Sequence, residues 1–210
     1  SEGGGSSKDH DFFLVQAITV RTYALANVRK HWKDGHHLCD DVHCQAYKGR
    51  CKLSHIMMAA SQTAGLVLVD ESNKMISAAF HSNSGGETVN SEDVWTIATP
   101  YLKAVVDTFS QGMRNYTWER RMLTTEWLNK LKQFYNYPIE NPEKRELALN
   151  FKQETRKINF PENIPLKNIR RDFNLRSTFF SVIHMGDSII LNGRGFGHGV
   201  GMSQEGAIRM

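Results

Sequence analysis

A glycine-rich segment near the carboxyl end of the sequence has a composition suited to ligand binding. Residues 192–206 read NGRGFGHGVGMSQEG, and glycine alternates with other residues from Gly193 to Gly201. Glycine allows left-handed backbone angles and lets a ligand approach the main chain, and a loop that leads into a helix can present N–H groups to a polar ligand. The segment lacks the Gly-Lys-Ser/Thr ending of a phosphate loop, and His198 stands where a dinucleotide fingerprint has its third glycine. A tight strand-to-helix turn with a structural His198 is the alternative.

A second chemical signal is a short polar segment, residues 36–44, that holds two of the three cysteines together with histidines; the third, Cys51, follows soon after. Zinc favours thiolate and imidazole ligands in a tetrahedral site. His37 and Cys39 can chelate from one extended segment, Cys44 supplies a third ligand, and His43 or a water supplies the fourth. The alternatives are a disulfide, either Cys39–Cys44 or Cys44–Cys51, and free thiols.

Several carboxyl groups are candidates for a general acid. Cleavage of a glycosidic bond needs a proton donor at the leaving oxygen, usually a carboxylic acid whose pKa is raised by a low-dielectric setting. The candidates in this sequence are Glu2, Glu87, Glu92, Asp93 and Glu205. Glu2 directly precedes three glycines, where the backbone can come close to a substrate. The alternative for Glu2 is a solvated residue with no catalytic role.

The elements that must position these groups begin with a helix over residues 9–30. Its apolar residues repeat at helical spacing on a wide face, which predicts a buried helix at the centre of the domain. The patterns that follow predict a loop over residues 36–49 and a second helix over residues 56–63. After them comes a predicted hairpin, whose two strands are residues 66–69 and 75–80.

The second half of the chain contains a charged stretch whose composition differs from both flanks. Residues 117–153 carry an apolar stripe at helical spacing and prolines follow, so we expect a helical, lid-like subdomain inserted over residues 110–165. Strand patterns return at residues 177–183 and 188–192. Segregated helices and antiparallel strands predict an α+β fold, a single domain with a central buried helix. Its core is expected to comprise residues 1–109 and 166–210.

Composition and charge bound the class of protein. The hydrophobic fraction of 40% and the charged fraction of 23% over 210 residues are typical of a globular protein. The net charge is +4, but the basic residues are dispersed without interleaved aromatic residues, so we expect no nucleic-acid partner. No run of apolar residues is long enough to span a membrane. We expect membrane attachment only through a segment that would precede Ser1.

Five blocks of the sequence, in this order, resemble the stage II sporulation protein D (SpoIID/LytB) family. They are the helix motif QAITVRTYAL at 16–25, the Cys/His loop at 37–47, the block 80–95 around Ser-Gly-Gly-Glu-Thr, the run 175–178, and the glycine-rich block 193–207. The blocks cover most of the chain outside residues 110–165, and the glycine-rich block is highly specific.

This resemblance implies a lytic transglycosylase that cuts the MurNAc–GlcNAc bond of peptidoglycan. A single glutamate, Glu2 here, would act first as acid and then as base. The muramyl 6-hydroxyl would attack the anomeric carbon and leave a 1,6-anhydro end, unlike the reaction of two-carboxylate glycosidases. Some family members are amidase enhancers that bind without cutting, which is the alternative for this chain. Two loops are expected to bind substrate, through Ser84, Gly85, Gly86, Glu87, Arg194, Gly197, His198, Ser203 and Gln204.

The resemblance also implies a structural zinc ion in the Cys/His loop, with His37, Cys39, His43 and Cys44 as predicted ligands. Zinc would shape the substrate groove and would not attack the bond. A metal-dependent amidase needs an open metal position with carboxylate or histidine ligands, which two thiolates do not favour. The implied partners are peptidoglycan glycan strands and, as a candidate, a cell-wall amidase. The implied location is extracytoplasmic, in the periplasm, the wall or at the outer face of the membrane.

Overall fold

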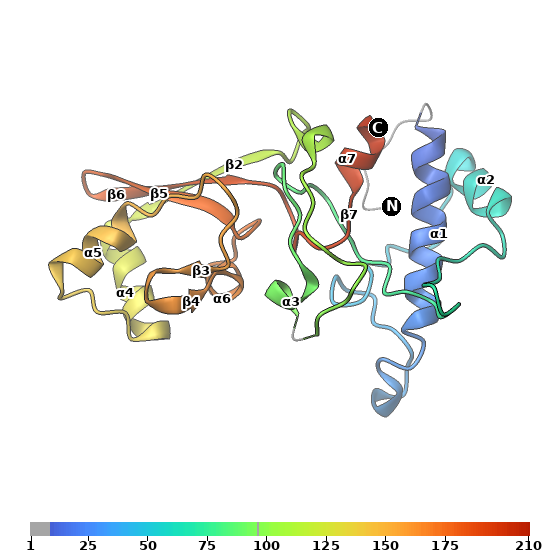
Figure 1. Cartoon of the computed structure of the whole chain (residues 1–210), viewed down its shortest axis with the longest axis horizontal. Helices are drawn as coiled ribbons and strands as arrows, with labels where there is room; N and C mark the ends of the chain where they lie inside the picture. The colour runs from blue at the N-terminus through green and yellow to red at the C-terminus, as the bar shows by residue number, and fades with distance from the viewer. Residues whose placement is uncertain (1–8, 96) are drawn as a thin grey trace. The chain divides into compact units, whose positions relative to one another are not determined.

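The computed structural model describes residues 9–95 and 97–210, and Figure 1 shows their course. The helices of the described residues are α1 (His10–Ala26), α2 (Ser54–Gln62), α3 (Ser91–Val94), α4 (Thr124–Tyr135), α5 (Pro142–Leu149), α6 (Leu166–Asp172) and α7 (Gln204–Arg209), with 3₁₀ turns η1 (Trp32–Asp34), η2 (Thr108–Ser110) and η3 (Pro161–Asn163). The strands are β1 (Phe80–His81), β2 (Thr117–Leu123), β3 (Asn159–Phe160), β4 (Ile164–Pro165), β5 (Phe179–Met185), β6 (Ser188–Arg194) and β7 (Met202–Ser203). This mixture confirms the predicted α+β class.

The chain divides into two compact units, which are described separately. The first unit comprises residues 1–80 and 207–210, and the second comprises residues 81–206. The predicted limits of an inserted subdomain, residues 110 and 165, stay a prediction. Within the described residues, no helix has both the length and the apolar character needed to cross a membrane.

The first unit is built on the predicted pair of helices. Phe12 and Phe13 of α1 pack with Ala59 of α2 in a small apolar cluster. Arg21 of α1 donates from Nη1 to the backbone oxygens of Thr63, at 2.7 Å, and Leu66, at 2.9 Å. These carbonyls lie just beyond the end of α2, where a helix leaves oxygens without internal donors. Arg21 therefore ties the end of α2 to the middle of α1.

The hairpin predicted over residues 66–80 forms only in part. Val69 and Met75 make an isolated antiparallel bridge, and Asp70 N–H donates to the Lys74 oxygen at 2.9 Å. The turn therefore lies where the sequence places it, but the flanking residues do not form a ladder. Leu68 N–H instead donates to the side chain of Thr22 on α1, at 2.9 Å. This bond uses a backbone donor that a longer hairpin would need.

The second unit contains an antiparallel sheet in the order β2-β6-β5. Residue pairs such as Trp118 with Gly193 and Val182 with Leu191 fix its register. One face carries alternating apolar residues that join helices α4, α5 and α6 in the main core of this unit, as period-two alternation requires. Trp127 of α4 is fully buried there, its ring 4.7 Å from that of Phe173, and its Nε1–H donates to the Ala148 oxygen at 3.0 Å.

The helix predicted to begin at residue 117 is wrong over its first seven residues, which form β2. Trp118 and Met122 are buried while Thr117, Glu119 and Arg121 are exposed, which is the alternation of a half-buried strand. The helical spacing of the apolar residues that follow belongs to α4, which begins at Thr124. The rest of the predicted stretch divides into α4 and α5, and the strands predicted at 177–183 and 188–192 appear as β5 and β6.

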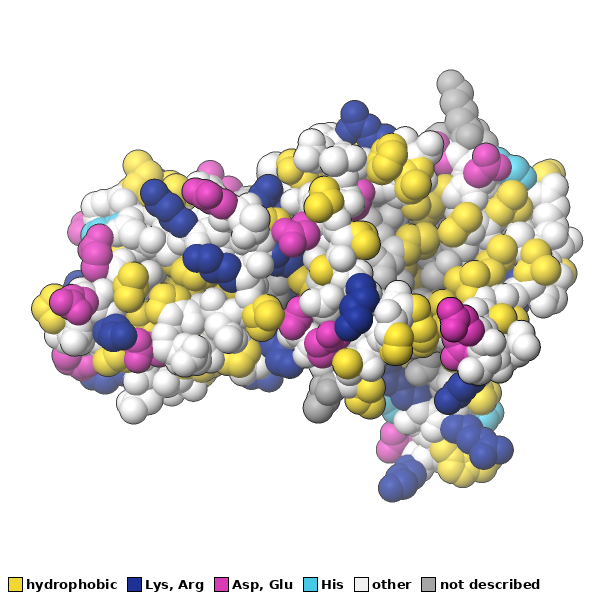
Figure 2. Space-filling model, in the orientation of Figure 1, with side chains coloured by type: hydrophobic (Ala, Val, Ile, Leu, Met, Phe, Trp, Pro, Cys, Tyr) yellow, Lys and Arg dark blue, Asp and Glu magenta, His cyan; other side chains and the backbone are white. Residues whose placement is uncertain are grey.

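The surface shows charges of both signs. On the face drawn in Figure 2, Lys and Arg side chains alternate with Asp and Glu side chains, and hydrophobic atoms lie between them. Several charged groups pair on the surface, for example Glu126 with Lys130 at 2.8 Å and Glu92 with Lys103 at 2.7 Å. Exposed pairs of this kind contribute little to stability.

Candidate functional site

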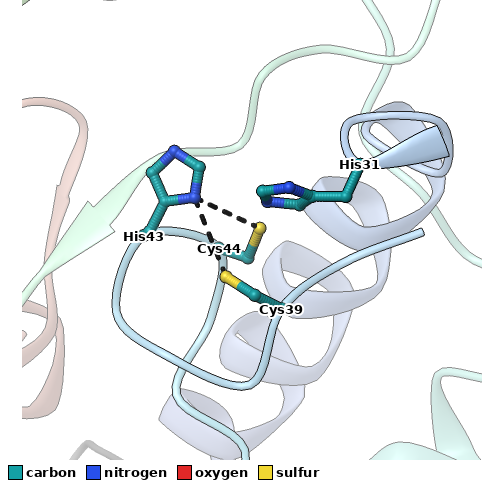
Figure 3. A group of neighbouring side chains, drawn as sticks. All are labelled: His31, Cys39, His43 and Cys44. Atoms are coloured by element: carbon teal, nitrogen blue, oxygen red, sulfur yellow. Dashed lines mark hydrogen bonds between the residues drawn. The ribbon is translucent and has the colours of Figure 1, made fainter. Parts of the chain in front are cut away.

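Four side chains in the first unit form a cluster of metal-ligand type. His31, Cys39, His43 and Cys44 each offer one ligand atom, and these atoms all lie within 4.8 Å of one another. Figure 3 shows the two imidazole rings and the two sulfur atoms turned toward a common point. His43 Nδ1 lies 3.7 Å from the sulfur of Cys39 and 4.0 Å from that of Cys44. Two thiols and two imidazoles are a donor set that suits zinc.

His31 has the hydrogen bonding of a metal ligand. Its Nδ1 lies 3.0 Å from a carboxylate oxygen of Asp34, and its Nε2 is buried without a hydrogen-bond partner in the part of the chain described. Metal-bound histidines commonly hold a carboxylate on the second ring nitrogen, which fixes the tautomer and orients the ring. An unpartnered buried nitrogen costs free energy unless something binds it. The residues present therefore fit a zinc ion.

The Cys39 thiol is suited to ionisation. Burial acts to raise the pKa of the Cys39 thiol, but hydrogen bonds with the Asp41 backbone and the Cys44 side chain outweigh it, and the net pKa lies below the ordinary value. Thiolate is the form of cysteine that binds metal. Cys44 is buried, and all three cysteines of the chain are free of disulfides, so the disulfide alternatives are not formed.

Hydrogen bonds from helix α1 and the residues after it hold the Cys/His loop in place. Gln45 donates from Nε2 to the Val20 oxygen on α1 at 3.2 Å, and the Lys30 ammonium donates to the His43 oxygen at 2.8 Å. Within the loop, Tyr47 N–H donates to the Asp40 oxygen at 2.8 Å. The loop has no regular secondary structure, so these contacts, together with the cluster, determine its conformation.

The cluster differs in one member from the predicted ligand set. Cys39, His43 and Cys44 come together as expected, but the ring of His37 lies outside and stacks on Trp32, with centroids 5.7 Å apart. His31 takes the fourth place. His31 was not among the predicted ligands because it directly follows the predicted helix, eight positions before Cys39 and outside the predicted loop. In the structure α1 ends at Ala26, so the chain can turn and bring His31 back to the loop.

In the second unit, the glycine-rich segment packs against the loop that contains Ser84. Asn83 and Phe196 exchange two backbone hydrogen bonds, of 3.1 and 2.8 Å. Gly195 has φ +81°, and a Cβ there would lie 2.8 Å from the Asn83 oxygen. Gly85 has φ +72°, and a Cβ there would lie 2.7 Å from the carbonyl carbon of Arg194. Both positions require glycine, because two backbones cross at this point.

A carboxylate and three hydroxyl groups connect these loops beneath the surface. Asp107 accepts hydrogen bonds from the hydroxyls of Ser84, at 2.7 Å, and Ser110. Ser110 in turn lies 2.7 Å from the hydroxyl of Ser203. Burial acts to raise the pKa of Asp107, but its hydrogen bonds from Ser110 and Ser84 hold that pKa below the ordinary value. Asp107 was not among the predicted site residues.

Glu205, one of the candidate acids, makes a second set of hydrogen bonds that link these loops. Its carboxylate accepts from Asn83 Nδ2 at 2.7 Å, from the Asn115 N–H at 3.0 Å, and from Asn115 Nδ2 at 2.7 Å. Glu205 is therefore suited to holding the loops together.

Three rings gather at the end of the glycine-rich segment. The His198 ring lies 5.2 Å from that of Trp95 and 5.6 Å from that of His81. Val200 N–H donates to His198 Nδ1 at 3.0 Å, and His81 Nδ1 lies 3.0 Å from the Val200 oxygen. Because a carbonyl oxygen can only accept, His81 carries its proton on Nδ1. Because Nδ1 of His198 accepts, the proton of a neutral His198 ring lies on Nε2.

An open groove of about 760 Å³ lies on the sheet face opposite the main core of this unit. Its lining includes Arg194, whose guanidinium lies 3.9 Å from the centre of the Phe179 ring, and Glu119 of β2. A neighbouring pocket of about 180 Å³ is lined by Glu87 and Arg156. Arg156 donates to the backbone oxygens of Glu87, at 3.1 Å, and Ser84, and burial lowers its pKa to about 10. Arg156 was not among the predicted site residues. Its hydrogen bonds hold the loop of residues 84–87 in place.

The predicted substrate-binding residues all fall in the second unit. Ser84, Gly85 and Ser203 are buried, whereas Gly86, Glu87, Arg194, Gly197 and His198 are partly exposed. Gln204 is buried at the start of α7. The predicted catalytic residue Glu2 lies outside the described residues. Substrate binding by these residues stays a prediction.

Comparison with known proteins identifies the family. Residues 5–69 match the family described as SpoIID, Stage II sporulation protein. The chain is 31% identical to a stage II sporulation protein D of Bacillus amyloliquefaciens and 30% identical to that of Bacillus subtilis, over 92% of this chain and 60% of each relative. It is also 24% identical to an amidase enhancer of Bacillus subtilis, over 92% of this chain and 34% of that protein. The resemblance seen in the sequence is thus confirmed: the chain is similar to proteins of the stage II sporulation protein D family. It spans 60% of the length of its two Bacillus sporulation relatives.

Proposed function

We propose that this protein binds bacterial cell-wall peptidoglycan and cleaves its glycan strands as a lytic transglycosylase. Similarity to two stage II sporulation proteins D carries the proposal, since the matches span 92% of the chain. In the proposed reaction, Glu2 donates a proton to the bridging oxygen as the bond from the MurNAc anomeric carbon breaks. The resulting carboxylate then removes the proton of the muramyl 6-hydroxyl as that oxygen bonds to the same carbon. Water is not consumed, and Glu2 regains its proton.

The second unit supports the proposal through its polar loops. The imidazole of His198 lies beside the indole of Trp95, and a polar ring next to an aromatic ring suits a sugar, which has hydroxyl groups and an apolar face. Arg194 adds a cation at the groove on the sheet. We propose that His198 and Arg194 contact the glycan, together with Glu87 and the exposed backbone of Gly86 and Gly197. The buried Ser84, Ser203 and Gln204 would hold those loops in shape.

Other candidate acids take part in hydrogen bonds. Hydrogen bonding with Lys103 lowers the pKa of Glu92, which favours its ionised form. Glu205 accepts three hydrogen bonds, Asp93 accepts from Asn90 Nδ2 at 3.1 Å, and Glu87 accepts from the Arg156 N–H at 3.2 Å. We propose Glu2 as the acid on the family resemblance, which implies a glutamate shortly before the helix motif at residues 16–25.

The proposal is tested by digestion of purified sacculi, with mass spectrometry of the soluble products. Wild-type protein should release muropeptides with 1,6-anhydro ends, and Glu2→Gln should release none while its thermal unfolding is unchanged. Glu143→Gln, on the exposed first turn of α5, is the matched control and should keep full activity. Activity of Glu2→Gln at the wild-type rate would contradict the role of Glu2. Blank traces from wild type and variant alike, with glycan binding retained, would exclude cleavage.

A second candidate function is wall binding that enhances an amidase without cutting. The similarity to a protein named amidase enhancer, over 92% of this chain, favours it. The same digestion separates the two functions when a cell-wall amidase is added. An enhancer raises the release of free stem peptides but produces no anhydro ends. Both functions require an extracytoplasmic location, which we propose for this protein.

We further propose that His31, Cys39, His43 and Cys44 hold a structural zinc ion. The two thiols, the two imidazoles and the Asp34 carboxylate behind His31 support this ligand set. Four protein ligands leave no open position, so zinc would supply fold stability to the Cys/His loop and no catalytic chemistry.

A further inference from the structure

Strand β2 is an open edge of the three-stranded sheet. It pairs with β6 on one side, and among the described residues no strand pairs on its other side. The opposite edge, β5, is covered, because Val182 N–H donates to the Phe151 oxygen at 2.7 Å and the Phe180 oxygen accepts from Gln153 Nε2 at 2.8 Å. One edge of the sheet, β5, is therefore covered, and among the described residues the other edge, β2, has no neighbouring strand. An uncovered edge strand of seven residues is a template for pairing with another chain.

The ladder shows which groups of β2 face outward. Gly195 N–H donates to the Tyr116 oxygen at 2.8 Å, directly beside the ladder. Since hydrogen-bonded and non-hydrogen-bonded pairs alternate in an antiparallel ladder, Trp118, Arg120 and Met122 bond to β6. The residues between them direct their N–H and C=O groups away from the sheet: Thr117, Glu119, Arg121 and Leu123. The side chains of these four residues are all exposed.

When two copies of β2 pair edge to edge, one register places opposite charges across from each other. In an antiparallel pair of two β2 strands about a two-fold axis through Arg120, Glu119 of each copy lies opposite Arg121 of the other. Thr117 then lies opposite Leu123, so all seven residues overlap. A shift of the axis by one residue toward Glu119 would pair Glu119 with itself, and a shift toward Arg121 would pair Arg121 with itself. Opposite charges across a pair stabilise a sheet, and like charges destabilise it.

Arg120 faces its own symmetry mate in this register, but its guanidinium is already occupied. Its Nη1 donates to the Phe173 oxygen of its own chain, on the core side of the sheet. Glu119 and Arg121 lie on the opposite face, where the groove is lined by Glu119. Because both copies present this face on the same side, pairing would make one continuous six-stranded sheet with the two grooves side by side.

We propose that the β2 edge mediates self-association, in which two copies pair their β2 strands in antiparallel register with Glu119 opposite Arg121 of the other copy. Full overlap of the strands and complementary charge coincide in this one register. The occupant of the edge is therefore a second copy of this chain.

Charge reversal tests the proposal. Sedimentation velocity over a wide range of protein concentration should show wild-type protein in monomer–dimer equilibrium. Glu119→Arg or Arg121→Glu alone creates two like-charge pairs per dimer and should weaken dimerisation about tenfold or more. The double variant E119R/R121E should dimerise as wild type does. An equimolar mixture of the two single variants should form a heterodimer, because each like-charged edge meets its complement.

The controls separate pairing from general charge effects and from unfolding. Glu126→Lys changes the net charge as Glu119→Arg does, but on the exposed face of α4, and should leave the dimer constant unchanged. Since the mixture uses the same two chains that fail to dimerise alone, its recovery shows that both are folded. Wild-type protein that stays monomeric throughout would overturn the proposal, as would single variants that dimerise normally or a mixture that does not recover.

Discussion

Ser203 donates its hydroxyl proton to Ser110, 93 residues away in the sequence, across 2.7 Å. The direction follows from Asp107, which can only accept and which receives the proton of Ser110. Ser203 also accepts from the Gly206 N–H at 3.2 Å. The hydroxyl of Ser203 thus both donates and accepts a hydrogen bond. These two bonds hold the start of α7 against the η2 turn.

Removing the acceptor at the centre of this network should destabilise the second unit. In Asp107→Asn, an NH₂ group replaces one carboxylate oxygen. Oδ2 accepts from the hydroxyls of Ser84 and Ser110 and Oδ1 accepts from the Ser110 N–H, so either orientation of the amide leaves at least one donor without its acceptor. We expect a loss of about 1–3 kcal/mol in the free energy of unfolding, measured by urea denaturation. Asp187→Asn, at the exposed β5–β6 turn, is the control and should change little. Equal stability of the two variants would show that the network contributes nothing.

The network illustrates what the sequence could and could not predict. The helix at α1, the helix at α2 and the β5–β6 strands were predictable, because each is a local pattern of apolar residues with its own period. Asp107, Ser84, Ser110 and Ser203 come from three separate segments, and only the fold brings them together. Strand β2 was missed although its alternation is visible, because Trp118 and Met122 also fit the helical stripe that continues into α4.

The glycine-rich segment shows the same limit at the candidate site. The sequence predicts close approach of some group to the backbone, and the structure supplies that group from the protein itself. A Cβ at Gly193 would lie 2.0 Å from the Trp118 ring, and one at Gly197 would lie 2.8 Å from the Cβ of His81. Composition alone cannot distinguish a glycine that admits a ligand from one that admits a neighbouring side chain.

A buried neutral histidine should make stability depend on pH in a defined window. Burial, followed by electrostatic interaction with His198 and Arg156, lowers the pKa of His81 to about 3, while the Asp107 charge and the Val200 hydrogen bond act in the opposite direction. The unfolded chain binds a proton at His81 below a pH of about 6.5, and the folded chain does not. Stability from this residue is therefore complete above that pH and falls as pH decreases toward 3, by about 2 kcal/mol at pH 5.

The variant His81→Gln isolates this contribution. Its amide can still donate to the Val200 oxygen but does not titrate. Urea denaturation at pH 8 and pH 5 should show a smaller drop in unfolding free energy for His81→Gln than for wild type. His184→Gln, which removes an exposed histidine of β5, should keep the wild-type drop. Parallel pH dependence of all three proteins would mean that His81 binds a proton in the folded state.

The last prediction distinguishes two ligand sets in the Cys/His loop. Protein prepared without chelators should contain one zinc ion per chain by elemental analysis. His31→Ala should lose most of the metal and should lower the thermal unfolding temperature, because it removes a proposed zinc ligand whose Nε2 has no hydrogen-bond partner among the described residues. His37→Ala, in the same loop, should retain zinc, because that ring stacks on Trp32 outside the cluster. Asp34→Asn should bind zinc more weakly than wild type, since the carboxylate that orients His31 is lost. Full zinc content in His31→Ala with loss in His37→Ala would restore the ligand set predicted from the sequence, and wild-type protein without zinc would exclude both sets.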